Sequence, residues 1–204
     1  MKLYYFPDSA ALAAHIALNE ARATFTIEKA DIFSKLTEAG GDYLAVNPKG
    51  TVPAIDFDDG TLLTENVAIL DWIAGTSAAL KPVDEGARRR QLELLAFLAS
   101  ELHKPFAFSF FVPGDEAGET IRDFIASRLA LLSGILAGDF LTGDAFAVPD
   151  ALAYVLLRWA TRGGYDLPAP LVAYRDRIEA RPAVRKALAE QDIGPVGAVQ
   201  ASVG

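Results

Sequence analysis

Apolar and polar residues follow two different periods along this chain. In residues 1–76, short runs rich in β-branched and aromatic residues, typical of strands, alternate with runs that have apolar residues at helical spacing. The strand-like runs are 2–6, 24–30, 54–57 and 61–63, and the helix-like runs are 10–22, 42–45 and 67–74. The resulting order, β-α-β-α-β-β-α, predicts a small four-stranded mixed sheet covered by helices.

The pattern turns helical after residues 77–86, which are rich in Ser, Pro and Gly and read as a linker. The helix-like runs that follow are 87–106, 119–136, 151–159, 170–180 and 183–190. Because 151–159 is apolar almost all round, we expect it at the centre of a bundle, with Asp150 capping its first turn. The sequence therefore predicts an α/β domain over residues 1–76 followed by an all-α domain over 87–204.

Two finer expectations concern the helical half. In the first long helix we expect one buried apolar stripe, made of Leu92, Ala96, Ala99, His103 and Phe106. At the end of the chain, residues 194–204 are rich in Gly and small residues and are expected to form a loose tail.

Composition narrows the classes of function. The formal charge of −8 and pI of about 4.8 disfavour a nucleic-acid partner. The chain has no cysteine and two histidines, so we expect no thiolate or all-histidine metal site and no protein thiol nucleophile. No apolar run reaches the roughly 20 residues of a membrane span, and the N-terminus enters a strand pattern directly. We expect a cytoplasmic protein.

The dipeptide Val52-Pro53 stands directly before a predicted strand. A cis bond here would turn the Val52 N–H and C=O outward, where an extended peptide can pair with them, but only about 5–6% of X-Pro bonds are cis. The alternative is an ordinary proline at a strand edge.

Glu65 and Asn66 lie where the second hairpin strand gives way to a helix. The free N–H groups of a helix start attract a carboxylate, and Thr64 or Asn66 can add a side-chain donor. Glu65 can hold an ammonium beside it, so the pair suits one end of a zwitterion. The alternative is plain helix capping.

Four stretches together resemble a known family: MKLYYFPDSAALAAHIALNEA, DYLAVNPKGTVPAI, DDGTLLTENVAILDWIA and ELHKPF, in this order. They are similar to bacterial glutathione S-transferases of the cysteine-type (beta) class, over residues 1 to about 190. The resemblance implies a thioredoxin-like N-terminal domain, an all-α C-terminal helical domain, a homodimer, and glutathione as the bound thiol, with no metal. Lys35 and Lys104 are candidates for binding the glycyl carboxylate of glutathione, and the resemblance implies that Lys35 stands at a glutathione-contacting position and that His103 faces the active-site cleft. Without it, the lysines would be surface residues and His103 a core residue.

The chain departs from the beta-class pattern at the residue that gives the class its name. Relatives carry cysteine and serine where this chain has Ala10 and Ala11, and often asparagine where it has Ala96. A thiol–disulfide reaction through the protein is therefore not expected. Conjugation still requires the thiol of glutathione, with a pKa near 8.5, to ionise near neutral pH, and lowering it by about 2 pH units takes roughly 2.7 kcal/mol.

One hydrogen bond to a charged group, at about 1.5–3 kcal/mol, and a helix N-terminus, at about 0.3–1, are sufficient for this ionisation. The candidate donors are Ser9, which can equally be a helix cap, then Tyr5 and His103. Aromatic residues after His103, namely Phe106, Phe108, Phe110 and Phe111, can line a site for an apolar electrophile or simply be core.

We therefore expect a glutathione transferase that conjugates glutathione to a hydrophobic electrophile. The alternatives are a non-catalytic glutathione-binding or scaffold protein, and a glutathione-dependent isomerase or lyase.

Overall fold

The computed structural model describes residues 1–112, 114 and 116–197. Its N-terminal part is a four-stranded sheet, as predicted, with the strand order β2-β1-β3-β4. The strands are β1 Lys2–Tyr5, β2 Thr26–Lys29, β3 Ala54–Asp56 and β4 Leu62–Thr64. β1 runs parallel to β2 and antiparallel to β3, and β3 and β4 form the expected hairpin.

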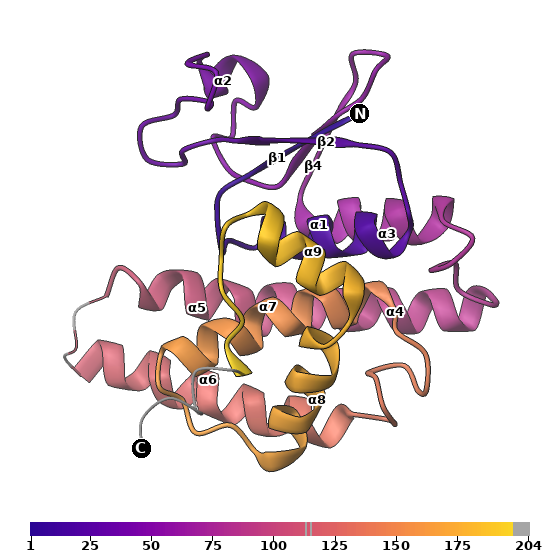
Figure 1. Cartoon of the computed structure of the whole chain (residues 1–204). Coiled ribbons are helices and arrows are strands. Elements are labelled where there is room, and N and C mark those ends of the chain that lie inside the picture. Colours follow the sequence, from indigo (N-terminus) through magenta and orange to yellow (C-terminus); the bar gives the residue numbers. More distant parts are fainter. Residues whose placement is uncertain (113, 115, 198–204) are drawn as a thin grey trace.

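Alternation along β1 decides which face of the sheet each helix covers. Leu3 is fully buried in the main core with α1 (Ala11–Glu20), eight of whose ten residues are buried. Tyr4, on the opposite face, packs with Tyr43 from α2 (Tyr43–Val46), with ring centroids 5.5 Å apart. In Figure 1, α1 and α3 (Asn66–Thr76) lie between the sheet and the helical part, while α2 covers the outer face.

The helix α7 (Val148–Arg162) is central, as its apolar sequence predicts, and twelve of its fifteen residues are buried. The other helices beyond α3 complete the bundle: α4 Glu85–Phe97, η1 Leu98–His103, α5 Lys104–Ser109, α6 Glu116–Ile135, α8 Ala169–Glu179 and α9 Pro182–Glu190. Of these, α4, η1 and α8 pack against α7, as do α1 and α3. One apolar cluster runs from Leu3 and Leu12 to Leu94 and Leu156, so the sheet and the bundle share a continuous core. In the described part of the chain, no helix is long and apolar enough to cross a membrane.

The structure corrects the expected stripe of the first long helix. The helical run from α4 to α5 contains a π-helical segment, η1, and its buried residues are Gln91, Leu94, Leu95, Leu98, Leu102 and Phe106. Leu92 is 40% exposed, and Ala96 is exposed as well. Two stripes were available in this sequence, and the one richer in leucine removes more apolar surface from water.

Two local expectations also change. Asp150 lies inside the first turn of α7 and accepts hydrogen bonds from the Leu141 N–H (2.9 Å), the Ala147 N–H (2.7 Å) and the Tyr174 hydroxyl (2.5 Å), so it ties α7 to its preceding loop and to α8. The start of the expected loose tail is held by hydrogen bonds to Arg158 and Glu179. Residues 198–204 lie outside the described residues.

Candidate functional site

Strand register brings the candidate segments to one edge of the sheet. Ala54 pairs with Tyr4 on one side and with Thr64 on the other. The residues just before Ala54, those just after Thr64, and the chain leaving β1 therefore meet at the same edge. β2 runs parallel to β1, so the loop after Lys29 emerges there too.

The Val52-Pro53 peptide bond is cis. The preceding carbonyl, on Thr51, accepts hydrogen bonds from the Tyr43 hydroxyl and the Asn47 amide, both at 2.8 Å. Neither the N–H nor the C=O of Val52 is hydrogen-bonded within the described residues. Tyr43 and Asn47 thus hold the loop in place through Thr51, and the backbone of Val52 offers an unused donor and acceptor to an extended peptide.

Glu65 begins α3 in a left-handed backbone conformation, with φ 73°. Its carboxylate is exposed and accepts a hydrogen bond from Lys49 Nζ at 2.6 Å. Lys49 also donates to Thr64 Oγ1 at 3.0 Å. Our sequence reasoning missed Lys49, although it lies in the Asn-Pro-Lys-Gly motif. Thr64 Oγ1 accepts from this lysine, which leaves its O–H free to be the ligand donor that we had expected.

Asn66 connects α3 to α1. Its Nδ2 donates to the Ala10 carbonyl oxygen at 2.8 Å, and this acceptor fixes which end of the side-chain amide faces α1. The other end, Oδ1, is buried and has no partner in the described structure. One of the two Nδ2 hydrogens is thus engaged inside the protein, which leaves at most one for the carboxylate that we had expected Asn66 to bind.

Ser9 caps the start of α1. Its hydroxyl donates to the Phe6 carbonyl at 2.7 Å and accepts from the Ala11 N–H at 3.2 Å. Ala10 is 5% exposed, and its own N–H has no hydrogen-bond partner among the described residues. Ser9 can donate to a ligand only by giving up its bond to Phe6, whereas the Ala10 N–H is available as it stands.

Tyr5 is buried at the end of β1, with its ring 6.4 Å from the His15 ring. Burial, helped by the negative charge of Glu38, raises the pKa of the Tyr5 hydroxyl, which therefore stays protonated. The hydroxyl has no hydrogen-bond partner in the part of the chain that is described. His15 contacts Glu190 at 2.8 Å and Gln191 at 3.1 Å, which makes it a structural link between α1 and α9.

His103, at the end of η1, lies against Trp159 with ring centroids 5.5 Å apart. Burial, helped by the positive charge of Lys104, lowers the pKa of His103 to about 4. The imidazole is therefore neutral near pH 7 and can donate or accept one hydrogen bond. Because the Trp159 indole N–H donates to the Asp8 carbonyl at 2.8 Å, His103 lies one side chain away from the loop that precedes α1.

The two candidate lysines are placed differently. Lys35 is half-buried, and its Nζ donates to the carbonyl oxygens of Ile32 and Gly50, the latter at 2.9 Å, so it ties two loops of the site edge together. Lys104 is exposed at the start of α5.

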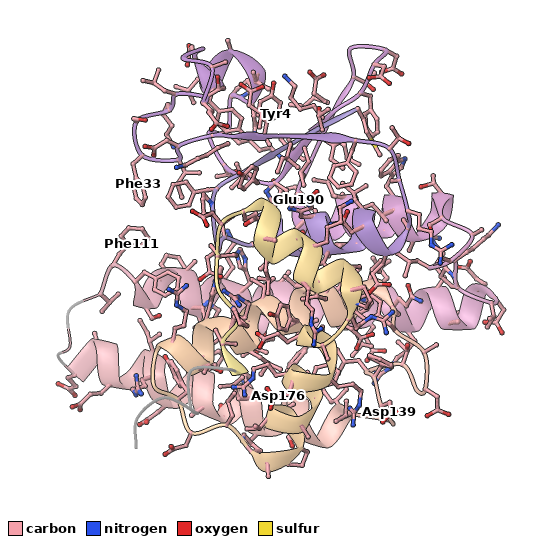
Figure 2. The ribbon with its side chains drawn as sticks, viewed as in Figure 1. Tyr4, Phe33, Phe111, Asp139, Asp176 and Glu190 are labelled. Carbon is pink, nitrogen blue, oxygen red and sulfur yellow. The ribbon has the colours of Figure 1, made fainter. Side chains whose placement is uncertain are left out.

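The aromatic candidates divide into core and surface. Phe106 is 1% exposed and packs on Trp159 and Tyr165, so it belongs to the core and does not line an open surface as expected. Phe108 and Phe111 are 63% and 74% exposed. Figure 2 shows Phe111 pointing toward Phe33, an exposed residue after β2 that sequence reasoning missed.

Two negative observations limit the chemistry. The described residues contain no group of three or more His, Asp or Glu side chains that could hold a metal ion. The chain also has no cysteine. What the edge offers is main-chain hydrogen bonding at Val52 and Ala10, the carboxylate of Glu65 and nearby apolar rings. These groups suit a zwitterionic peptide better than a metal or a nucleotide.

Known proteins similar to this chain share its architecture. The glutathione S-transferase N-terminal domain family matches residues 9–76. Glutathione S-transferase GstA of Escherichia coli O157:H7 is 37% identical, with 95% of this chain and 100% of that protein covered.

Two solved structures cover 95% of this chain and 100% of their own. The bacterial GST BphK, in a ternary complex, has a TM-score of 0.89 at 37% identity. A sphingomonad glutathione S-transferase complexed with glutathione has a TM-score of 0.86 at 40% identity.

Proposed function

Because this chain belongs to the glutathione S-transferase family, we propose that it binds glutathione at the sheet edge, ionises its thiol and conjugates it to an apolar electrophile. The single observation that carries the proposal is the meeting of the unpaired Val52 backbone, the Glu65 carboxylate and the start of α1 at that edge.

Glutathione is an extended tripeptide with an ammonium and two carboxylates, and each group has a counterpart here. The N–H and C=O of Val52 pair with the backbone of its central residue. The exposed Glu65 carboxylate receives the ammonium, and a γ-glutamyl carboxylate lies against the start of α3. Lys104 is the cation for the glycyl carboxylate, while Lys35 shapes the loop beside it.

The sulfur then lies at the start of α1, where Ala10 stands in place of the cysteine of beta-class relatives. The Ala10 N–H, a helix start and one hydroxyl together match the roughly 2.7 kcal/mol needed to lower the thiol pKa by about 2 pH units. Of the side-chain donors, Tyr5 has a hydroxyl with no partner among the described residues, and Ser9 must first break its hydrogen bond to the Phe6 carbonyl. His103 is neutral, and the Trp159 side chain separates it from the loop before α1. We rank them in this order.

The second substrate is an apolar electrophile. Phe108 and Phe111 present exposed rings from α5 and the turn after it, and Phe33 faces them from the loop after β2.

We also propose a homodimer, supported by the outward face of α4 with Leu92 and Ala96, and a cytoplasmic location. Sedimentation at micromolar protein and cell fractionation test these two points.

Two measurements test the function. Calorimetry with millimolar glutathione is expected to show saturable binding, and its absence would refute the proposal. A conjugation assay with an aryl halide is expected to show turnover, whereas binding without turnover would identify a scaffold protein. Tyr5→Phe is expected to reduce turnover more than Ser9→Ala, because the Ser9 hydroxyl donates to Phe6 whereas the Tyr5 hydroxyl has no partner among the described residues.

A further inference from the structure

We propose that Asp8 is a positioning residue through which the helical part of the protein holds the start of α1 in place for ionising the glutathione thiol. The inference depends on the proposed function, because it concerns the same thiol. It adds a residue that neither the sequence pattern nor the site edge singled out.

Within the described residues Asp8 makes four hydrogen bonds, all to residues far along the chain. Its N–H donates to Gln191 Oε1 at 3.3 Å, and its carbonyl accepts from the Trp159 indole at 2.8 Å. Its carboxylate accepts from Arg158 Nε at 3.0 Å and from Arg162. Both backbone groups and the side chain are therefore fixed by α7 and by the residue that follows α9.

The backbone of Asp8 has an uncommon conformation that these contacts hold in place. Asp8 has φ 54°, in the left-handed region. A non-glycine residue there costs roughly 1–2 kcal/mol unless its surroundings hold it. Asp8 is followed by Ser9 and Ala10, so this bend sets the direction in which the Ala10 N–H leaves the loop.

Arg158 makes the arrangement rigid. Its side chain is 1% exposed, and its guanidinium also reaches Glu179 at 3.7 Å and the Gly194 carbonyl at 3.0 Å. A buried guanidinium that loses its carboxylate partner is strongly destabilised, so the pair with Asp8 is hard to open. The loop before α1 is thereby tied to α8 and to the chain at residue 194.

A purely structural role is the competing explanation, since these bonds also join the two parts of the protein. The two roles differ in what they do to the sulfur. A positioning role affects the ionisation of the bound thiol, whereas a structural role affects folding and the grip on the whole tripeptide equally.

The test compares Asp8→Asn and Arg162→Met with the native protein. Arg162 is 59% exposed, so its replacement removes one contact to Asp8 without opening the core. Arg177→Met is the matched control, because Arg177 is paired with Asp139 at 3.2 Å, away from the loop. Thiolate absorbance of bound glutathione is titrated against pH, and affinity for S-methylglutathione, which has no ionisable thiol, is measured by calorimetry.

In Asp8→Asn we expect the apparent pKa of the bound thiol to rise by about one pH unit, which lowers the thiolate fraction about tenfold at mildly acidic pH. Arg162→Met should raise this pKa by about half a pH unit, a roughly threefold drop in the thiolate fraction, and Arg177→Met should leave the pKa unchanged. Affinity for S-methylglutathione should change less than about twofold in all three.

An unchanged thiol pKa in both Asp8→Asn and Arg162→Met would overturn the inference, as would a parallel loss of S-methylglutathione affinity. If Asp8→Asn does not fold, Arg162→Met alone decides. Glutathione binding by the native protein is measured first. Its absence would refute the proposed function and this inference together, whereas binding with an unchanged thiol pKa in the variants would refute the inference alone.

Discussion

Asn66 Nδ2 donates to the carbonyl oxygen of Ala10 at 2.8 Å, so the start of α3 and the start of α1 are joined by one side chain. In our proposal, the start of α3 binds the amino end of glutathione, and the start of α1 binds its sulfur. A substitution at Asn66 should therefore alter the geometry of both helix starts.

Asn66→Asp is expected to be more harmful than Asn66→Ala. The aspartate would set a carboxylate against the Ala10 carbonyl, two buried acceptors facing each other, at a cost of about 1–3 kcal/mol, whereas alanine loses one hydrogen bond worth about 1 kcal/mol. We expect the glutathione Kd to rise about fivefold in Asn66→Ala and more in Asn66→Asp. Calorimetry and thermal unfolding measure both effects.

Asn19→Ala is the control for this pair, since Asn19 makes one long bond, 3.4 Å, to Glu190 away from the site. Native-like glutathione binding by Asn66→Asp would contradict the role given to Asn66.

Glu65→Gln should separate binding from stability. The pair with Lys49 is exposed at both ends, so its loss should move the Tm by no more than about 1–2 °C. If Glu65 holds the ammonium of glutathione, the Kd should rise at least about tenfold, because a hydrogen bond between charged groups is lost. Isothermal calorimetry and a thermal melt on the same sample give both numbers.

Glu93→Gln is the matched control, since Glu93 is an exposed partner of Arg90 at 3.0 Å in α4. Equal glutathione affinities in the native protein, Glu65→Gln and Glu93→Gln would exclude Glu65 from the binding site.

Ala10→Cys should restore the chemistry that this chain lacks. A thiol at the start of α1 has its pKa lowered by the helix N-terminus, so it should react rapidly with oxidised glutathione near pH 6.5, where an ordinary thiol of pKa about 8.5 is slow. Intact-protein mass spectrometry reports the mixed disulfide. The exposed linker variant Ala78→Cys is the control and should react at least about tenfold more slowly at that pH.

If Ala10→Cys and Ala78→Cys reacted at the same rate, the start of α1 would not be a thiolate-stabilising position.

His103 should make the protein less stable in acid. Its pKa is lowered from 6.5 to about 4 in the folded protein, so between these values the unfolded chain binds more protons, and stability falls as the pH falls. His103→Gln removes the titrating imidazole and with it this loss of stability. Urea unfolding near pH 7 and near pH 5 should show a smaller loss of stability in the variant.

Asp150 acts in the opposite direction, because burial raises its pKa to about 6 and stability falls as the pH rises from about 4 to 6. The comparison of native protein with His103→Gln cancels this contribution. An identical pH dependence in both proteins would contradict the burial of a neutral imidazole at this position.

Local signals in the sequence predicted the sheet and its hairpin well. The Asp58-Asp59-Gly60 turn and the alternation on either side of it set the hairpin, and Gly60 has the positive φ, 80°, that this turn requires. The residues around Val52-Pro53 left the cis bond and an ordinary edge-strand proline open, since an X-Pro bond is usually trans.

Long-range polar contacts could not be predicted in this way. Asp8 and Arg158 are 150 residues apart, and nothing in either neighbourhood indicates the other. The buried stripe of α4 was also missed, because Leu92-Ala96 and Leu94-Leu98 have the same helical spacing and only packing distinguishes them. The engagement of Asn66 with Ala10 depends in the same way on how α3 and α1 meet.

The alanine at the start of α1, in a chain with no cysteine anywhere, has a consequence for durability. Covalent inhibitors and peroxides that permanently disable thiol enzymes find no protein thiol to modify. In the mechanism proposed above, the reactive sulfur belongs to glutathione, which leaves the site after each turnover. A glutathione molecule whose sulfur has been oxidised or alkylated therefore dissociates and is replaced by an unmodified one.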